Sequence, residues 1–197
     1  ISSAGVMNTY GKLLNSDLTG KLKNKLKTVT KTDGHLCLYI GMKGSPKDLG
    51  LSTTNLWIYP SYDHDKNVKQ YLEDRNRPFP VLYLSFPSTK DPEKLDSSPN
   101  RTTMEAITLS PFSWFEKWKD QPWKNRGEDY ESMKEQFCQR MFDQIFLTLP
   151  QLKNKIDYYE LSTPLSTKSM MNYNGVELYG LEHTPSRFRQ RWLRPQT

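Results

Sequence analysis

Five short apolar runs, each followed by a polar stretch, constrain the fold of this chain more than any other feature of its sequence. They are HLCLYIGM at 35–42, NLWIYP at 55–60, FPVLYLSFP at 79–87, TTMEAITLSP at 102–111 and KIDYYELSTP at 155–164. Runs of this length that are rich in aliphatic and aromatic residues predict β-strands. The first run is almost continuously apolar, which predicts a strand covered on both faces.

Helical periodicity fills much of the sequence between these runs. The strongest pattern begins near Gly127 and ends near Pro150, and weaker patterns cover 65–75 and 17–26. In the strongest pattern, apolar residues recur at steps of three and four: Tyr130, Met133, Phe137, Met141 and Ile145. Such a stripe predicts one buried helix face. The sequence therefore predicts an α+β fold, in which a mixed, largely antiparallel sheet carries helices packed on one side.

The chain is long enough to form one domain with a buried core. It has 197 residues, of which 35% are hydrophobic and 12% are aromatic. Aromatic side chains bury a large area each, and their abundance argues against disorder of the whole chain. The polar stretch FPSTKDPEKLDSSPNRTT at 86–103 predicts a long surface loop between two strands.

The charged residues and cysteines exclude few classes of function. A formal net charge of +6 allows an anionic partner without selecting nucleic acid, lipid or protein. Basic residues gather at 21–31 and 187–194, and a solvated surface is the simpler interpretation of both clusters. Cys37 and Cys138 lie in apolar runs, which indicates buried thiols rather than a disulfide. The cysteines and the three histidines show no metal-ligand spacing.

Signatures of common enzyme sites are absent from the sequence. It contains no G-x-G-x-x-G, no phosphate-binding loop, no H-E-x-x-H and no G-x-S-x-G. Two other segments carry more information about function than these motifs do.

The first segment is SPFSWFEKWKDQPWKNRGEDY at 110–130, where tryptophans alternate with lysines. This mixture is typical of contacts with a lipid interface and of stacking on nucleic-acid bases. The lipid hypothesis assigns the bilayer contact to Trp118, Trp123 and the neighbouring lysines. The simpler interpretation is that Trp114 and Phe115 pack into the core and Trp118 covers them.

The second segment is STPLSTKSMMNYNGVELYGLEHTPSRFRQRWLRPQT at 162–197. Gly175 and Gly180 permit positive φ or a close backbone approach, and Pro185 restricts Thr184 to an extended conformation. The many hydroxyl side chains suit the rim of a pocket as well as a structural role. A single histidine such as His183 is more typical of a structural residue than of a catalyst.

This second segment resembles the region before the last flavin-contacting motif of retinol saturases and carotenoid isomerases. These enzymes form a branch of the phytoene-desaturase-like FAD-dependent oxidoreductases. ISSAGVMNTYGKLL at 1–14 is similar to the segment by which the chain leaves the FAD domain in that branch. GMKGSPKDLGLSTTNLWIY, YLSFPSTKDP, RTTMEAITLSPFSWFEKW and KNRGEDYESMK also have counterparts there. The resemblance covers nearly the whole chain, and it is specific for the branch rather than for a substrate.

The resemblance implies that residues 1–197 are a substrate-binding domain excised from a larger enzyme. Its nucleotide-binding segments would lie before residue 1 and after residue 197, and the two ends of this chain would lie close together. FAD would be bound mainly by those other segments, with contacts here from Ser3, Ala4, Gly5 and Gly180, and NAD(P)H could serve as the reductant.

The resemblance also implies chemistry on the conjugated C=C bonds of a retinoid or carotenoid-like polyene, by saturation, desaturation or isomerisation. The apolar strand runs would form the far wall of a tunnel for this hydrophobic substrate. Tyr179, His183 and Tyr173 are the candidates for a catalytic proton donor. The partners would be the polyene, the FAD-binding domain and a peripheral membrane surface, and no nucleic acid is expected.

Two alternatives to the enzyme stay open. One is a non-catalytic module that binds lipid or nucleic acid through a basic, aromatic-rich face. Against nucleic acid, acidic residues intersperse with the basic ones and no RNA-recognition signature is present. The other is a scaffold that kept the substrate-domain fold and lost the flavin.

Overall fold

A computed structural model describes residues 2–14, 22, 24–173 and 179–193. Five strands form one sheet in the order β2-β3-β4-β1-β5. The strands are β1 (Gly34–Lys43), β2 (Leu56–Ile58), β3 (Leu82–Ser85), β4 (Arg101–Ser110) and β5 (Ile156–Ser162). Every neighbouring pair in this sheet is antiparallel. All five predicted strands are therefore confirmed, as is the α+β class.

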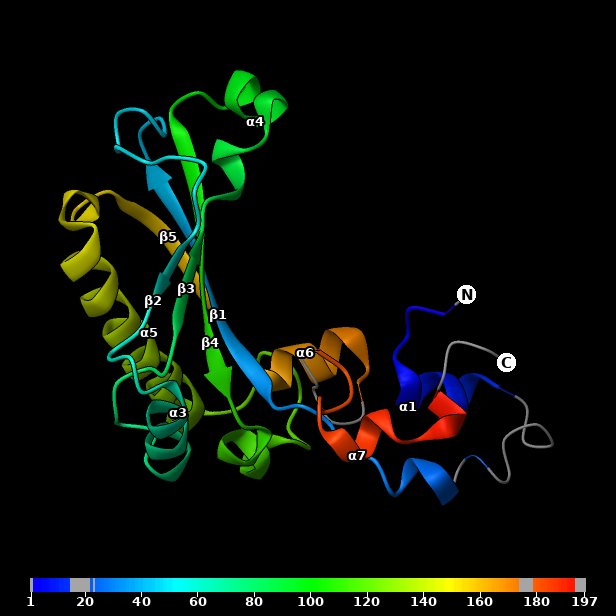
Figure 1. Cartoon of the computed structure of the whole chain (residues 1–197). Coiled ribbons are helices and arrows are strands. Elements are labelled where there is room, and N and C mark those ends of the chain that lie inside the picture. The colour runs from blue at the N-terminus through cyan, green and yellow to red at the C-terminus, as the bar shows by residue number, and fades with distance from the viewer. Residues whose placement is uncertain (1, 15–21, 23, 174–178, 194–197) are drawn as a thin grey trace.

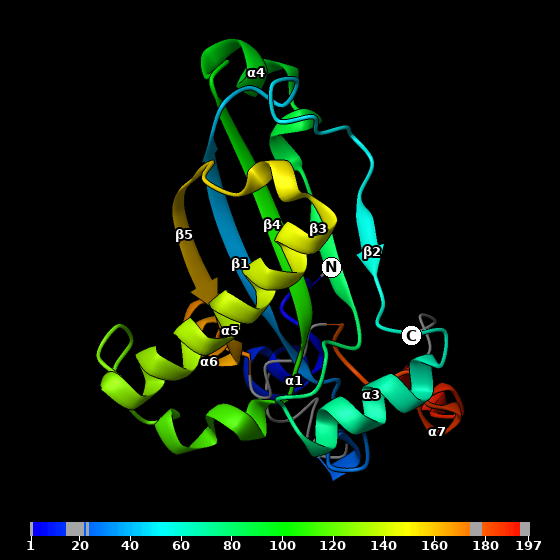
Figure 2. The same cartoon turned by 90° about the vertical axis from the view of Figure 1, so that its left-hand side faces the viewer.

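The long helix α5 (Glu128–Thr148) lies across one face of the sheet (Figures 1 and 2). Its buried side chains include the whole predicted stripe: Tyr130, Met133, Phe137, Met141 and Ile145. Three acidic residues occupy its first turn, where the helix dipole favours negative charge. Gly127 precedes the helix with a φ of 79°, a conformation that glycine adopts without strain.

The main core lies between α5 and the sheet. Successive strand residues point to opposite faces, so alternate residues of β1 reach this core: Leu36, Leu38, Ile40 and Met42. The helix α3 (His64–Glu73) packs at one end of the core through Tyr71, whose ring meets Phe79 and Trp114 with centroids 5.8 and 5.1 Å apart. The sheet thus buries one face under helices, as the sequence predicts.

The second face of β1 differs from the sequence-based expectation. No helix in the described part of the chain lies over the middle of this face (Figure 1). Tyr39, in the middle of β1, is 45% exposed. Cys37, on the same face, is only 2% exposed. The prediction of cover on both faces therefore holds at Cys37 and is wrong at Tyr39. Only alternate residues of the predicted tunnel wall can face a ligand, because Leu36, Leu38 and Ile40 are in the core.

The tryptophan-rich segment forms a 3-10 helix at Phe112–Trp118. Trp118 is only 5% exposed, and its ring lies 5.4 Å from that of Tyr130. Trp118 therefore cannot reach a bilayer, and the core-packing interpretation of this segment is confirmed. Trp123 is 49% exposed with Lys124 over its ring, and a peripheral membrane contact through these two residues stays a prediction.

The remaining elements are short. They are α1 (Val6–Asn8) with a π-turn at Thr9–Leu13, α4 (Pro92–Ser97), α6 (Pro164–Met171), α7 (Pro185–Phe188) and 3-10 turns at Pro87–Thr89, Pro150–Leu152 and Arg191–Leu193. The predicted loop at 86–103 thus contains a 3-10 turn and α4. The residues outside the described part of the chain include Lys21, Lys23, Gly175 and Arg194. Most of the weak helical pattern at 17–26 also lies outside it. No described helix has the length and hydrophobicity needed to span a bilayer.

Both terminal segments belong to an arm that leaves the lower end of the sheet, as Figure 1 shows. A small second hydrophobic cluster holds the arm together through Met7, Leu26 and Leu181. Near the two ends of the chain, the rings of Tyr10 and Trp192 meet edge to face at 6.2 Å. The assignment of the chain to an excised domain stays a prediction.

Candidate functional site

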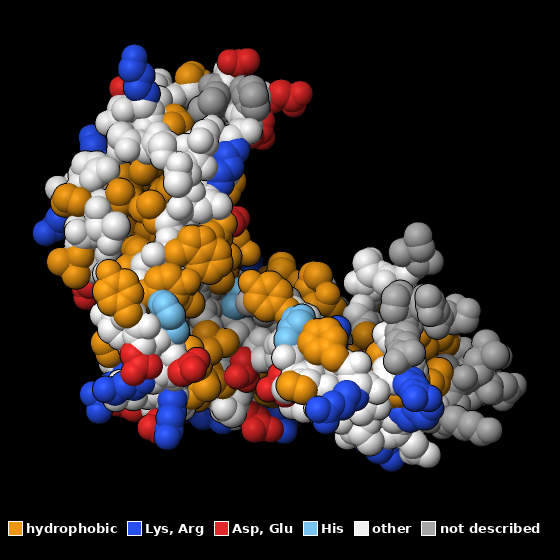
Figure 3. Space-filling view, viewed as in Figure 1, with side chains coloured by type: hydrophobic (Ala, Val, Ile, Leu, Met, Phe, Trp, Pro, Cys, Tyr) orange, Lys and Arg blue, Asp and Glu red, His pale blue; other side chains and the backbone are white. Residues whose placement is uncertain are grey.

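The uncovered face of the sheet meets the arm at an inner corner. Figure 3 shows hydrophobic side chains continuing from the exposed strands across this corner onto α6. Gly34, the first residue of β1, lies against Pro164, the first residue of α6. A Cβ at Gly34 would come within 3.1 Å of Pro164 Cγ and 3.2 Å of the Ser110 carbonyl oxygen. Glycine therefore allows α6 to pack close to the start of β1.

A row of side chains crosses the uncovered face from edge to edge. The strand register pairs Trp57 with Tyr83, Tyr83 with Ile107, Ile107 with Cys37, and Cys37 with Ser162. Neighbouring strands lie about 4.8 Å apart, so four steps span about 19 Å. The Trp57 and Tyr83 rings are 4.6 Å apart. This row is apolar and aromatic except at its last member, Ser162, and we call it the cross-strand row.

A hollow of about 330 Å³ lies where the cross-strand row ends, between β1, β5 and α6. Polar side chains from all three elements line it: His35, Tyr39, Ser162, Ser166 and Thr167. Tyr173, two residues after α6, also contributes to the lining. Two methionines of α6, Met170 and Met171, supply its apolar wall. Lysine, arginine, aspartate and glutamate do not contribute to this lining. We call it the corner hollow.

Burial favours the neutral forms of His35 and Tyr39 in the corner hollow. Desolvation lowers the pKa of His35, which favours the uncharged imidazole at neutral pH. The Nδ1 atom of this ring is buried without a hydrogen-bond partner. Desolvation, together with the nearby Cys37, raises the pKa of Tyr39 to about 12, so this phenol keeps its proton. The corner hollow can therefore offer hydrogen bonds without offering charge.

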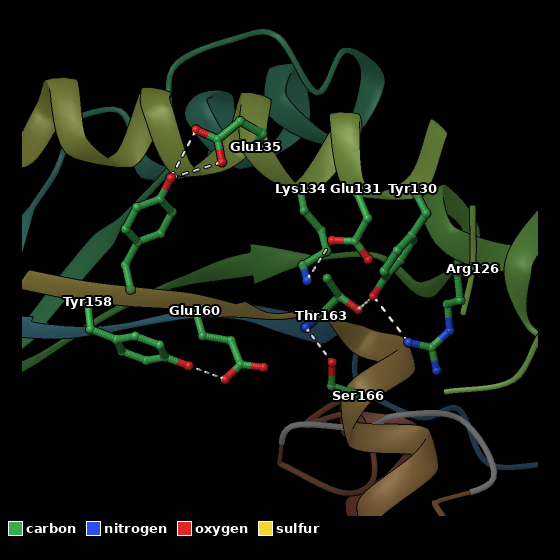
Figure 4. Close-up of polar contacts among 10 residues, drawn as sticks. Arg126, Tyr130, Glu131, Lys134, Glu135, Tyr158, Glu160, Thr163 and Ser166 are labelled. Carbon is green, nitrogen blue, oxygen red and sulfur yellow. Dashed lines mark hydrogen bonds and ion pairs between the residues drawn. The ribbon is translucent and has the colours of Figure 1, made fainter. Parts of the chain in front are cut away.

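A buried polar cluster fixes α6, the outer wall of the corner hollow, to the start of α5 (Figure 4). Arg126 is 5% exposed, and its Nη2 donates to the Ser169 hydroxyl at 3.0 Å. The Tyr130 hydroxyl shares a 2.7 Å hydrogen bond with the Thr163 hydroxyl. The backbone N–H of Thr163 donates to Ser166 Oγ at 3.2 Å. These contacts join Arg126 and the first turn of α5 to the N-cap and body of α6.

We expect Thr163→Val to lower the free energy of unfolding by about 1–3 kcal/mol, because it leaves the buried Tyr130 hydroxyl without its 2.7 Å partner. Chemical denaturation measures the loss. Thr167→Val is the matched control, since Thr167 is a half-buried residue of the same helix, and its effect should stay within about 0.5 kcal/mol. Equal losses for the two variants would contradict a specific role for the Tyr130–Thr163 bond.

The structure separates the three predicted catalytic residues. Tyr173 lines the corner hollow. Tyr179 is 71% exposed, and its backbone N–H donates to Thr32 Oγ1 at 3.2 Å. His183 is exposed, with its ring 6.2 Å from that of Phe188. Only Tyr173 among the three contributes to the corner hollow.

The predicted cofactor-binding residues fall into two places. Ser3 is exposed and Ala4 half-buried at the start of the described chain. Gly5 adopts a φ of 79°, and a Cβ there would lie 3.5 Å from Tyr173 Cε1. Gly5 therefore sits beside the corner hollow. Gly180 has a φ of 76°, and its carbonyl oxygen accepts hydrogen bonds from the N–H and hydroxyl of Thr32.

Sequence reasoning missed His35 and Tyr39, which the strand places in the corner hollow. The missed signal is the alternation within HLCLYIGM: His35, Cys37 and Tyr39 share one face, and the leucines between them share the other. Polar residues on every second position mark the uncovered face of a strand that is buried on one side only.

A larger hollow, of about 480 Å³, lies elsewhere along α5. Its lining includes Arg75, Glu135 and Arg140. The Arg140 guanidinium donates to the carbonyl oxygens of Arg75 and Arg77 at 2.6 Å, so this groove anchors the segment after α3. None of the predicted catalytic or cofactor-binding residues lines this larger hollow. Among the described residues, no group of three or more His, Cys, Asp or Glu side chains could hold a metal ion.

Comparison with known proteins identifies one group of relatives. No protein-family model matches the chain. The all-trans-retinol 13,14-reductase of Danio rerio is 30% identical over 194 residues, and that of Rattus norvegicus is 33% identical over 193 residues. Each alignment covers 95% of this chain and 32% of the relative. A Danio rerio protein named inactive all-trans-retinol 13,14-reductase is 31% identical over 84% of this chain and 28% of its own length.

These alignments confirm the resemblance drawn from the sequence motifs. The chain spans about one third of the length of the curated relatives that it matches. Over nearly its whole length it is homologous to that third of the all-trans-retinol 13,14-reductases, the retinol saturases.

Proposed function

We propose that this chain is the substrate-binding part of an FAD-dependent oxidoreductase that acts on a C=C bond of a retinoid or similar polyene. The observation that carries the proposal is the alignment of 95% of the chain with proteins named all-trans-retinol 13,14-reductase. The rest of such an enzyme would lie in segments beyond this chain, because the alignment accounts for 32% of each of these two relatives.

The uncovered face of the sheet supports this proposal physically. The cross-strand row presents Trp57, Tyr83 and Ile107 on a face that no described helix covers in its middle. The Asn55 amide donates to the Tyr83 hydroxyl at 2.7 Å, which fixes the tilt of this ring. Aromatic and aliphatic side chains on a rigid sheet suit the flat, apolar body of a polyene.

The described residues fit only a peripheral contact with FAD. The Gly5 carbonyl oxygen accepts the N–H of Thr9 at 2.9 Å, and that of Gly180 is occupied by Thr32. The sequence has no G-x-G-x-x-G turn for a pyrophosphate. Ser3, Ala4 and Gly5 would approach the cofactor from the side of the corner hollow, and segments outside this chain would bind most of it.

A bound, reduced flavin supplies a hydride for saturation of the double bond, while a protein group or water supplies the proton for the neighbouring carbon. Of the three candidate donors, Tyr173 is the best placed, because it lines the corner hollow and lies beside Gly5. The residues of this chain would orient the polyene on the sheet and exclude water from the corner.

The test uses the full-length natural protein that contains this sequence. We expect the purified protein to show the visible absorption of oxidised flavin and, after anaerobic reduction, to convert all-trans-retinol to a product two hydrogens heavier by mass spectrometry. Retinol mixed with reduced free flavin is the control. One relative is named inactive, so turnover must be measured directly. A protein without flavin absorption and without turnover would contradict the proposal.

A further inference from the structure

We propose that the corner hollow binds the uncharged hydroxyl end of an alcohol-terminated polyene, with His35 as its hydrogen-bond partner and the polyene along the cross-strand row. This inference rests on the proposed function and adds to it a position and an orientation for the substrate. It also predicts which end group the protein accepts.

The lining of the corner hollow suits a group that is polar but uncharged. Five hydroxyl side chains and one imidazole converge on about 330 Å³ beside two methionines. The His35 Nδ1 is shut off from solvent without a partner, which leaves Nε2 as the ring nitrogen available to a ligand. Burial lowers the pKa of His35, so the neutral ring can exchange one hydrogen bond with an alcohol.

Charges next to the corner hollow disfavour a ligand that ends in a carboxylate. In the strand register, Tyr39 lies between Glu105 of β4 and Glu160 of β5. Both carboxylates therefore share the uncovered face with Tyr39, whereas no lysine or arginine lines the corner hollow. A ligand carboxylate would lose its hydration there, gain no cationic partner and meet two like charges.

This orientation of the polyene agrees with the position of the 13,14 bond in the relatives' name, all-trans-retinol 13,14-reductase. In all-trans-retinol the carbon that carries the hydroxyl is bonded to C14. A hydroxyl held by His35 therefore keeps the 13,14 double bond within a few bonds of the corner hollow, near Tyr173 and Gly5. Cys37 is buried, so the remainder of the polyene can then extend past it over Ile107 and Tyr83 along the cross-strand row.

Equilibrium binding to the full-length natural protein that contains this sequence tests this inference with three ligands that share one polyene. They are all-trans-retinol, its deoxy analogue with a methyl group in place of CH₂OH, and all-trans-retinoic acid at neutral pH. We expect retinol to bind about three- to tenfold more tightly than the deoxy analogue, the range of one neutral hydrogen bond. Retinoic acid should bind at least about tenfold more weakly than retinol.

His35→Ala should abolish the preference for retinol over the deoxy analogue while leaving the affinity for the deoxy analogue unchanged. His35→Gln should retain part of the preference, because an amide can still donate or accept. His64→Ala is the matched control, since His64 is an exposed histidine at the start of α3, and it should behave as the unaltered chain does. Circular dichroism confirms that each variant is folded.

The outcomes separate this inference from the proposed function. If the unaltered chain binds retinol and the deoxy analogue equally, the inference is overturned and the proposed function stands. The same holds if a folded His35→Ala variant keeps the full preference. If the chain binds none of the three ligands, both the inference and the assignment of the polyene site to this chain are overturned.

Discussion

Phe115→Ala is expected to lower the free energy of unfolding by about 3–5 kcal/mol, because it removes a fully buried ring and leaves a cavity. Phe115 has no exposed surface. Its ring packs near those of Trp118, Tyr130 and Phe137, with centroids 6.2–6.4 Å apart. The surrounding rings are fixed to α5 and to one 3-10 helix, so they cannot easily collapse into the gap.

Urea denaturation followed by tryptophan fluorescence measures this loss. Trp123→Ala is the control from the same segment, since Trp123 is half-exposed, and it should change the free energy of unfolding by no more than about 0.5 kcal/mol. If the two variants lose similar amounts, the segment at 110–130 does not contribute to the core as described. A larger loss for Trp123→Ala than for Phe115→Ala would contradict the burial of Phe115.

The two thiols are expected to resist alkylation in the native state. Burial raises the pKa of both Cys37 and Cys138 from 9.0 to about 12. At pH 8 the thiolate fraction is then about 1000-fold smaller than in an unfolded chain, since each pKa unit is a factor of ten. Only the thiolate reacts with iodoacetamide. Mass spectrometry after a timed exposure should therefore find the native chain almost unlabelled.

The control is the same exposure in guanidinium chloride, where both thiols should react completely. Rapid labelling of either thiol in the native chain would contradict its burial.

The raised pKa values of the two thiols also set the sign of a stability change at alkaline pH. The unfolded chain releases its thiol protons near pH 9, and the native chain holds them to about pH 12. This contribution to stability is thus complete below pH 9 and is lost as the pH rises toward 12.

The strands and the long helix were predictable because each has a local pattern of apolar residues in the sequence. The apolar stripe of α5 recurs every three or four residues, and all five of its predicted members are buried. What covers each strand face was not predictable in the same way. On the face opposite the core, HLCLYIGM carries the buried Cys37 and the exposed Tyr39. Both side chains are largely apolar, so the sequence does not show the alternation that a lysine or glutamate would have revealed.

The candidate site was less predictable than the fold because it is made by tertiary contacts. His35 and Tyr173 are 138 positions apart in the sequence and meet only because α6 packs against the start of β1. Tyr173 could be chosen from its neighbourhood of hydroxyl residues and from the family resemblance. His35 carried no motif, and sequence reasoning considered it only as a metal ligand.

The pleat of the sheet has a consequence for how proteins of this kind can diverge. Leu36, Leu38 and Ile40 hold the core, whereas His35, Cys37 and Tyr39 face the opposite side. Selection can therefore exchange residues of the second set to suit a new small molecule while the first set preserves foldability. Two relatives could share this scaffold, retain similar melting temperatures and still have evolved different chemistries.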